Sequence, residues 1–114
     1  QMCYIAKALV SEPDILVLDE PESNLDFNNQ SLIINWLHTL SREKNVTIIL
    51  NTHFINHANN IADKCLLMGK DSYCFGTTQS VLQESLLADY FHVPVKRCHF
   101  EHNGIQKESF IVAL

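Results

Sequence analysis

Apolar residues fall into short runs that alternate with longer segments of helical spacing over most of the chain. Residues 15–18 and 46–50 are continuous apolar or β-branched runs closed by polar residues, a pattern typical of parallel strands buried on both faces. Residues 64–68 and 73–75 predict two further strands, with a turn at 69–72 between them. Strands separated by helical segments indicate an α/β fold whose sheet is mainly parallel and flanked by helices.

Helical spacing is most regular over about residues 28–43, where Asp26 stands in the right place to cap the first turn. Other helices are predicted over 2–10, over about 54–62 and, as one or two short helices, within about 79–91. The buried stripe of the helix over 28–43 is expected to consist of Leu32, Ile33, Trp36, Leu37 and Leu40.

The last part of the chain, residues 93–114, is predicted to be a C-terminal extension. Residues 95–100 and 106–112 indicate two strands, and Asn103-Gly104 lies between them. Asn-Gly between two strands is a strong signal for a tight hairpin turn. We therefore expect a C-terminal β-hairpin.

Composition fits a single compact domain, since the chain has 114 residues and is 46% hydrophobic. The formal net charge of -5 argues against a nucleic-acid partner, because binding to a nucleic-acid backbone usually shows as a basic surface patch. No apolar run approaches the roughly 20 residues that a membrane span needs. The chain begins with Gln1 rather than Met, so we expect it to be a piece of a longer protein.

The four cysteines are far apart in sequence and form no C-x-x-C pair: Cys3, Cys65, Cys74 and Cys98. A zinc site or a redox dithiol is therefore not expected. We expect the four cysteines to be reduced thiols. The positions of the histidines leave two possible metal sites open. His53 and His57 are four residues apart, a spacing that a metal could use, although a solvated His57 is the simpler reading. Cys98-His99 with His102 could also hold a metal, but an exposed strand end is favoured there.

Charged and polar residues follow the first two predicted strands directly. Asp19 and Glu20 come after the first strand, and His53 comes after the second. Ligands of open α/β sheets bind at the carboxyl ends of the strands, so these three side chains are expected at one site. Adjacent carboxylates repel each other, and a bound Mg²⁺ would relieve that cost while the second carboxylate orients or deprotonates a water. The alternative for an isolated Asp-Glu pair is a solvated strand end.

Four segments in a fixed order resemble the ATP-binding-cassette (ABC) ATPases. Ile15–Pro21 resembles the Walker B strand, and Ser23–Asp26 resembles the D-loop that follows it. Gln1–Leu9 resembles the helix after the signature motif, and Thr52-His53 resembles the switch-histidine position. The resemblance implies the C-terminal part of one nucleotide-binding domain over 1–114, an incomplete P-loop NTPase domain of the RecA-like type.

The resemblance also implies a role for each matching residue. Asp19 would hold Mg²⁺ through water, and Glu20 would act as the catalytic base or would polarise the attacking water. His53 would contact the γ-phosphate of ATP. Ser23 and Asp26 would lie by the nucleotide at the interface with a second cassette. ATP and Mg²⁺ are the implied cofactors, and positioning and electrostatics supply most of the catalysis in such phosphoryl transfer.

The chain departs from the family pattern in two substitutions and one absence. Glu22 stands where Thr is usual, and Lys7 stands where Arg is usual; both are interpreted as tolerated variation. No G-x-x-x-x-G-K-[ST] phosphate loop occurs, since none of Gly69, Gly76 and Gly104 precedes a Lys-Ser or Lys-Thr pair. We therefore expect the full-length protein to be an ATPase and the chain alone to be inactive.

Residues 86–95 resemble the tail of cassettes that serve metal-chelate importers, the iron-siderophore and cobalamin group. His92 stands where Gly is common in that group, and an ordinary amphipathic helix followed by an extended segment is the alternative. The resemblance implies a second ABC ATPase subunit, in a homodimer, and membrane permease subunits as partners. It implies a peripheral location at the cytoplasmic face of a bacterial cell membrane and the import of a metal chelate.

Two other functions remain open at this point. One is an ABC-family ATPase that does not serve transport, and the other is a non-catalytic remnant that acts as an interaction module. The presence of Asp19, Glu20 and His53 together argues against the remnant. In this ATPase class the phosphate-loop strand lies between the strands that match 46–50 and 64–68. We therefore expect an open slot in the sheet, and we expect the isolated chain either to self-associate or to exist only together with the rest of its protein.

Overall fold

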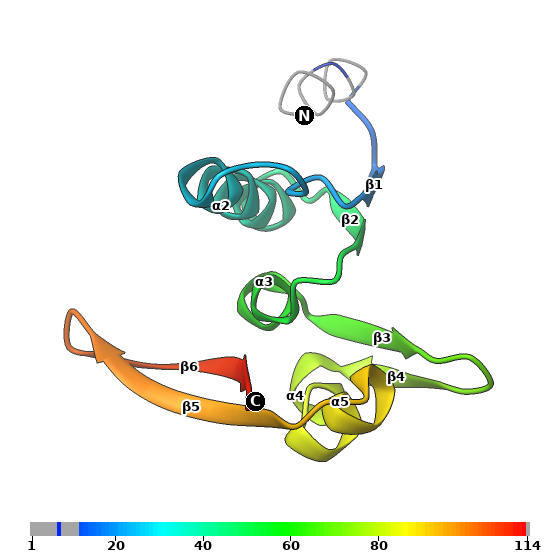
Figure 1. The fold of residues 1–114 in the computed structure, drawn as a ribbon. Coiled ribbons are helices and arrows are strands. Elements are labelled where there is room, and N and C mark those ends of the chain that lie inside the picture. The colour runs from blue at the N-terminus through cyan, green and yellow to red at the C-terminus, as the bar shows by residue number, and fades with distance from the viewer. Residues whose placement is uncertain (1–6, 8–11, 114) are drawn as a thin grey trace. The chain divides into compact units, whose positions relative to one another are not determined.

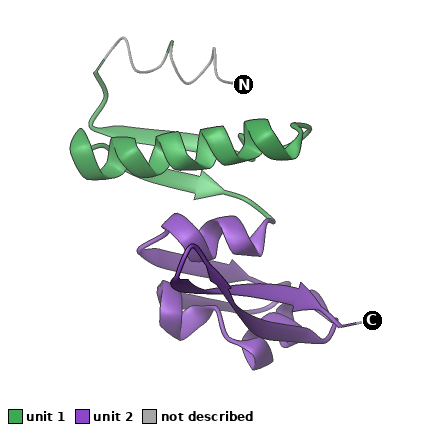
Figure 2. Ribbon diagram, turned by 90° about the vertical axis from the view of Figure 1, so that its left-hand side faces the viewer, with its two compact units in different colours: residues 1–53 green, residues 54–114 purple. Residues whose placement is uncertain are grey.

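The computed structural model describes residue 7 and residues 12–113, which fall into two compact units, residues 1–53 and 54–114 (Figure 2). The predicted helix over 2–10 and the segment Gln1–Leu9 lie outside the described residues, except for residue 7. None of the described helices combines the length and the apolar character that a membrane span requires.

Unit 1 is a parallel strand pair with one crossover helix (Figure 1). Its elements are β1 (Ile15–Asp19), α2 (Phe27–Glu43) and β2 (Thr47–Asn51). These bounds agree with the predicted ones to within one residue. Parallel strands need a long connection, which α2 supplies, and the register pairs Asp19 with Asn51 at the carboxyl ends.

Helix α2 begins where the sequence predicted its cap. The Asp26 carboxylate accepts a hydrogen bond from the backbone N–H of Asn29 at 2.8 Å. This bond satisfies one of the donors that the first turn of a helix leaves without an intrahelical partner. The helix ends at Glu43, and Asn45 follows in the left-handed region with a φ of 54°.

The buried stripe of α2 differs from the predicted one at two positions. Its buried residues are Ile33, Ile34, Leu37 and Leu40. Leu32 is 48% exposed, so its assignment to the stripe was wrong, and Trp36 is only half-buried. A helix turns by about 100° per residue, which places Leu32 about 140° around the helix from Leu37.

The prediction that both strands of unit 1 are buried on two faces is wrong for the described residues. Leu16 of β1 is buried, but Ile15, Val17 and Ile49 are exposed. Side chains of a strand alternate between faces, and the register sets Val17 beside Ile49 on the same face. Among the described residues, α2 is the one complete helix of this unit, and these exposed side chains of β1 and β2 are not covered by it.

Unit 2 contains three helices and two antiparallel strand pairs. Its elements are α3 (Ile55–Ile61), β3 (Lys64–Met68), β4 (Tyr73–Thr77), α4 (Thr78–Val81), α5 (Glu84–Phe91), β5 (Val95–His102) and β6 (Ile105–Val112). The α/β class is confirmed, but a mainly parallel sheet is not found in the described residues. They form three two-stranded sheets, of which only β1–β2 is parallel. The connections within β3–β4 and β5–β6 are short turns, which can join only antiparallel neighbours.

The predicted C-terminal hairpin is confirmed as β5–β6, with strands longer than the sequence indicated. Asn103 and Gly104 have φ values of 52° and 76°. Positive φ at both central residues defines the type I′ turn, whose twist matches that of the flanking strands. The Asn-Gly pair therefore sets the register of the hairpin.

The hairpin is held on a small apolar core. Buried side chains of α4, α5 and the hairpin form this core, namely Val81, Leu82, Leu87, Val95 and Phe110. The Asn56 side chain of α3 accepts from the N–H of Phe110 at 2.7 Å and donates to its carbonyl at 3.1 Å. Arg97 donates to the carbonyl of Leu82 at 2.8 Å and lies 5.1 Å from the centroid of the Phe110 ring.

Helix α5 ends at His92, which adopts the left-handed conformation with a φ of 60° and a ψ of 33°. Glycine occupies such helix ends most easily because it has no Cβ. The resemblance to metal-chelate importers leads to the expectation of Gly at this position, and His92 adopts here the conformation that Gly would take most easily.

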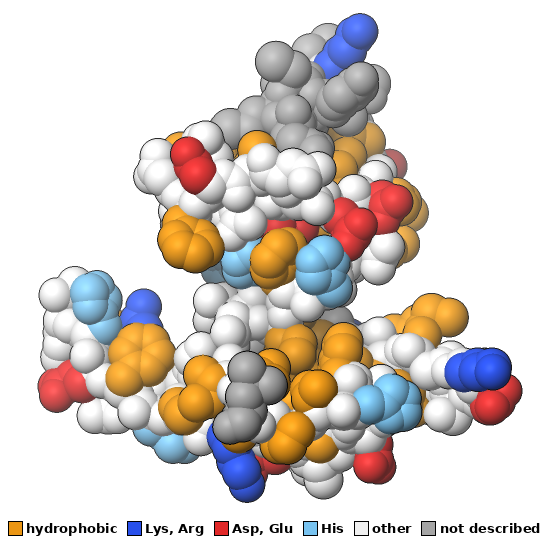
Figure 3. Space-filling view, viewed as in Figure 1, with side chains coloured by type: hydrophobic (Ala, Val, Ile, Leu, Met, Phe, Trp, Pro, Cys, Tyr) orange, Lys and Arg blue, Asp and Glu red, His pale blue; other side chains and the backbone are white. Residues whose placement is uncertain are grey.

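Both units expose apolar side chains on one face of a strand pair, and patches of hydrophobic side chains are visible on the side of the molecule that Figure 3 shows. In unit 2 the exposed pairs are Leu66 with Phe75 and Met68 with Tyr73. β2 and β3, which match the strands on either side of the expected slot, belong to separate sheets. Open strand edges and apolar faces favour association between chains.

We expect residues 1–114 alone to self-associate because these faces are open. Light scattering coupled to gel filtration is expected to show species larger than a monomer. Replacing Val17 and Phe75 together by Lys is expected to shift the distribution toward the monomer, and Asp14→Lys, at an already polar position, is the control. A monodisperse wild-type monomer that melts cooperatively would contradict this prediction.

Candidate functional site

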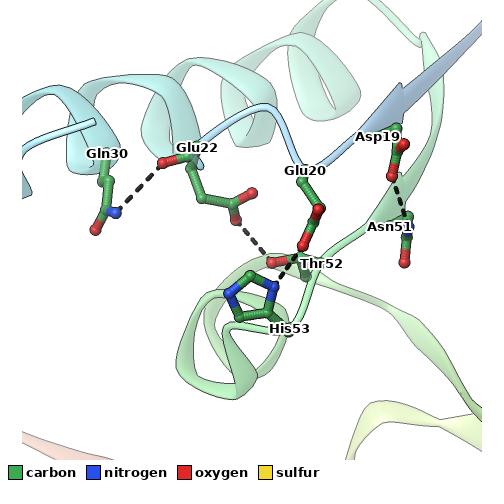
Figure 4. Close-up of polar contacts among 7 residues, drawn as sticks. All are labelled: Asp19, Glu20, Glu22, Gln30, Asn51, Thr52 and His53. Atoms are coloured by element: carbon green, nitrogen blue, oxygen red, sulfur yellow. Dashed lines mark hydrogen bonds and ion pairs between the residues drawn. The ribbon is translucent and has the colours of Figure 1, made fainter. Parts of the chain in front are cut away.

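The carboxyl ends of β1 and β2 bring together the polar residues that follow the two strands (Figure 4). The Asn51 amide donates to Asp19 Oδ1 at 2.6 Å, across the last pair of the register. An ionised carboxylate has two oxygens, so Oδ2 can face a ligand while Oδ1 keeps Asn51. Sequence reasoning missed Asn51 as a site residue; its signal was its place directly opposite Asp19.

Glu20 turns the chain away from the strand. Its N–H donates to the Asn51 carbonyl at 2.7 Å, and its own carbonyl accepts from the N–H of Ser23 at 3.1 Å. Its φ is 45°, in the left-handed region that costs a non-glycine residue about 1–3 kcal/mol. Backbone bonds on both sides of Glu20 hold this strained conformation.

Glu20 and His53 are in contact through Glu20 Oε1 and His53 Nδ1 (Figure 4). The two side chains are 40% and 60% exposed, so the pair lies at the surface of unit 1. A ring that donates from Nδ1 holds the carboxylate in place and directs its other nitrogen away from it. A carboxylate fixed in this way can accept a proton from a water or orient it. The sequence expected His53 near Glu20, and the described residues place it there.

Ser23 and Asp26 lie further along the same loop. The N–H of Ser23 is bonded to the carbonyl of Glu20, and the Asp26 carboxylate caps α2. Asp26 is exposed and Ser23 is half-buried. Their expected roles at a nucleotide and a second cassette therefore stay predictions.

Glu22 lies in the loop after Glu20, and its burial was not predicted from the sequence. Its side chain is fully buried, at 0% exposure. Glu22 Oε2 accepts a hydrogen bond from Thr52 Oγ1 at 3.0 Å, and the Glu22 carbonyl accepts from Gln30 Nε2 at 3.3 Å (Figure 4). No local pattern distinguishes an acid in a loop that is buried from one that is solvated. The interpretation of Glu22 as tolerated variation therefore overlooked its contacts.

Within the described residues, no three His, Cys, Asp or Glu side chains gather in a way that could hold a metal ion by themselves. His57 lies within α3 and stacks on Phe54. Cys98 and His99 are neighbours on β5 and point to opposite faces of the hairpin. Neither of these metal-site alternatives is supported.

Asp19 could serve as the one protein carboxylate that Mg²⁺ needs when it is bound together with a nucleotide. Mg²⁺ takes hard oxygen ligands and is commonly held by one or two carboxylates together with phosphates and water. Asp19 is exposed, and its carboxylate is oriented by Asn51. A protein cage of several acids is not required for this kind of binding.

A family model described as "AAA domain, putative AbiEii toxin, Type IV TA system" matches residues 1–54, which is less than half of the chain. Relatives extend the likeness over both units. The molybdate import ATP-binding protein MolC of Haemophilus influenzae is 38% identical over 96% of this chain. The "Probable metal transport system ATP-binding protein" of Thermotoga maritima is 35% identical over 75% of it. The chain spans 42% and 36% of these two proteins.

Solved structures show the same likeness in three dimensions. A "putative metal-chelate type ABC transporter" in an inward-facing conformation matches 96% of this chain and 44% of its own, with a TM-score of 0.94 and 33% identity. The cbiO1 protein of Clostridium perfringens, part of the ABC transporter complex cbiONQ, covers 75% of the chain with a TM-score of 0.62 and 32% identity. The chain therefore belongs to the ATP-binding-cassette transporter ATPase family, and it matches part of such an ATPase domain.

Proposed function

We propose that the protein to which this chain belongs is the ATP-hydrolysing subunit of an ABC transporter. The observation that carries the proposal is the contact of Glu20 with His53, beside Asp19, at the carboxyl ends of two parallel strands. Relatives that cover most of the chain are named as ATP-binding proteins of transport systems, which supports the same function.

In this proposal each residue has one task at a bound nucleotide. Asp19 holds Mg²⁺ through water, and the ion would neutralise charge on the phosphates when bound. Glu20 orients the attacking water and accepts its proton, since its carboxylate is held by His53. His53 also reaches the terminal phosphate with the ring nitrogen that does not contact Glu20. Phosphoryl transfer depends mainly on such positioning, which a strand-end turn with backbone bonds on both sides supplies.

The partners we propose are a second ABC ATPase subunit and membrane permease subunits. Ser23 and Asp26 are proposed to lie where the second subunit, in a homodimer, meets this one, because both belong to the loop between β1 and α2, in which Asp26 is exposed and Ser23 is half-buried. Docking on a permease would place the protein peripherally on the cytoplasmic face of a membrane. The net charge of -5 and the absence of a basic cluster from the sequence favour these partners over nucleic acid.

The substrate we propose is a metal-containing small molecule. The structural neighbour that matches 96% of the chain is described as metal-chelate type, and the MolC relative imports molybdate by its name. Import of an iron-siderophore is the finer form of this proposal. Uptake of a radiolabelled iron-siderophore and of radiolabelled molybdate, each measured in cells with and without the gene, would separate the two substrates.

Asp19→Asn in the full-length protein is expected to raise the Mg²⁺ concentration needed for half-maximal ATPase activity by about 10- to 100-fold. The reason is that the charge that attracts the hydrated ion is lost, while the shape of the side chain is kept. Magnesium titrations of ATP turnover measure the effect. Asp14→Asn, an exposed acid just before β1, is the matched control and is expected to leave the titration unchanged.

Wild-type full-length protein without Mg²⁺-dependent ATP turnover would refute the proposed ATPase. Turnover without co-purification of any permease would instead favour an ABC ATPase outside transport. An Asp19→Asn titration that coincides with the wild type would remove Asp19 from the magnesium site and leave the rest of the proposal standing.

A further inference from the structure

Glu22 is the only charged or polar side chain that is buried among the residues the structure describes, and it has no exposed surface. A carboxylate removed from water is costly unless hydrogen bonds replace its hydration. A protein gains nothing in stability from an acid at such a place compared with an apolar side chain of similar volume. The contacts that Glu22 makes are therefore the place to look for its purpose.

Those contacts join three segments of unit 1. The Gln30 side chain of α2 donates to the Glu22 carbonyl at 3.3 Å, which ties the Glu22 backbone to the helix. The Thr52 hydroxyl donates to Glu22 Oε2 at 3.0 Å, which ties the end of β2 to Glu22. His53, the residue after Thr52, contacts Glu20, the residue two before Glu22 (Figure 4). Two acids of one loop thus hold two consecutive residues of the other strand end.

The Glu20–His53 and Glu22–Thr52 contacts differ in how strongly each can hold its partner in place by itself. Glu20 and His53 are both well exposed, so water competes for their contact, and the contact depends on the surrounding chain to keep both side chains in place. The Glu22–Thr52 bond lies in a part-buried setting, where water competes less. The Glu22–Thr52 bond is therefore expected to be the more persistent of the two contacts, and it holds the residue that directly precedes His53.

We propose that Glu22 is a positioning residue that fixes Thr52 so that the His53 ring stays on the Glu20 carboxylate. Glu22 acts through Thr52 and His53 and does not itself touch the nucleotide. Its effect on turnover rests on the proposed ATPase function, whereas its effect on the His53 ring does not.

The kinetic test uses three single variants and one double variant of the full-length protein. Glu22→Met keeps the volume and removes both oxygens, Thr52→Val removes the hydroxyl at constant shape, and Glu22→Gln keeps an oxygen that can accept from Thr52. Glu22→Met and Thr52→Val are each expected to lower kcat about 10-fold with the KM for ATP changed less than twofold, because misplaced groups slow the chemical step. Glu22→Gln is expected to retain most of kcat, and the double variant Glu22→Met/Thr52→Val is expected to be no slower than the single variants.

A stability control separates positioning from folding. Leu40→Ala, a buried position of α2 outside the site, is expected to lower the unfolding midpoint without lowering kcat per folded molecule. If Glu22→Met does not fold, Thr52→Val still tests the proposal. Thr52 is half-buried and Val has nearly the same shape, so this variant is expected to fold.

A second readout does not require ATP turnover. In protein labelled with ¹⁵N-histidine, the Nδ1 resonance of His53, assigned with His53→Gln, is expected to report a hydrogen-bonded ring in the wild type and in Glu22→Gln. It is expected to move toward the value of a free imidazole in Glu22→Met and Thr52→Val. Unchanged His53 resonances in both variants would overturn the proposal, as would additive losses of kcat in the double variant. If the wild type hydrolyses no ATP while the His53 resonance still moves in Glu22→Met and Thr52→Val, the proposed function is refuted and the inference is supported.

Discussion

Replacing Glu20 by Gln in the full-length protein is expected to lower kcat for ATP hydrolysis by about 10²- to 10⁴-fold, the range that a positioned general base contributes. Gln keeps the length of the side chain, so the left-handed backbone at this position and the loop that follows are expected to persist. The amide oxygen can still contact His53, but it cannot accept a proton from water. The KM for ATP is therefore expected to change little, and steady-state kinetics of phosphate release measure both constants.

Glu43→Gln is the matched control for this prediction, because it makes the same chemical change at an exposed acid at the end of α2. It is expected to leave kcat unchanged. Glu20→Gln with wild-type kcat would show that Glu20 is not the base. The Glu20–His53 contact would then have to be explained as a structural feature of the strand ends.

Replacing Leu37 by Ala is expected to destabilise the protein by about 2–5 kcal/mol, the usual cost of truncating a fully buried leucine. Leu37 is 0% exposed at the centre of the buried stripe of α2. The loss combines the transfer free energy of the removed atoms with a cavity that the neighbouring side chains fill only in part. The midpoint of urea unfolding, followed by circular dichroism of the full-length protein, measures the effect.

Leu32→Ala is the matched control on the same helix and makes the same chemical change. Leu32 is 48% exposed, so its truncation is expected to cost less than about 1 kcal/mol. Equal destabilisation by the two variants would mean that Leu32 is buried in the full-length protein. The stripe predicted from the sequence would then be right, and the exposed position found for Leu32 would belong to the chain in isolation.

The order and type of the elements followed from local signals. β-Branched and apolar runs indicated β1, β2 and β3, the Asp26 cap located the start of α2, and Asn103-Gly104 set the hairpin turn. These signals act over a few residues, through backbone conformation and capping bonds, so they are legible in the sequence. The positions of Asp19, Glu20 and His53 at strand ends followed from the same signals together with the rule for parallel strands.

Burial and pairing were less legible because they depend on neighbours distant in sequence. Continuous apolar runs predicted two covered faces, yet only one face of β1–β2 is covered in the described residues. A run of apolar residues records the need for burial and does not identify what supplies it. The pairing of β3 with β4 rather than within a larger parallel sheet follows from the short turn between them.

The sequence by itself therefore determined the elements of this chain, its α/β class and the resemblance of Asp19, Glu20 and His53 to the site residues of an ABC ATPase. Only the tertiary structure decided that Asn51 orients Asp19, that Glu20 and His53 are in contact, and that Glu22 is buried against Thr52. The physical reason is that these contacts join side chains about 30 residues apart, at distances set by the parallel register. A sequence displays residue types and spacing, whereas hydrogen-bond partners and burial arise only when the strands and α2 pack together.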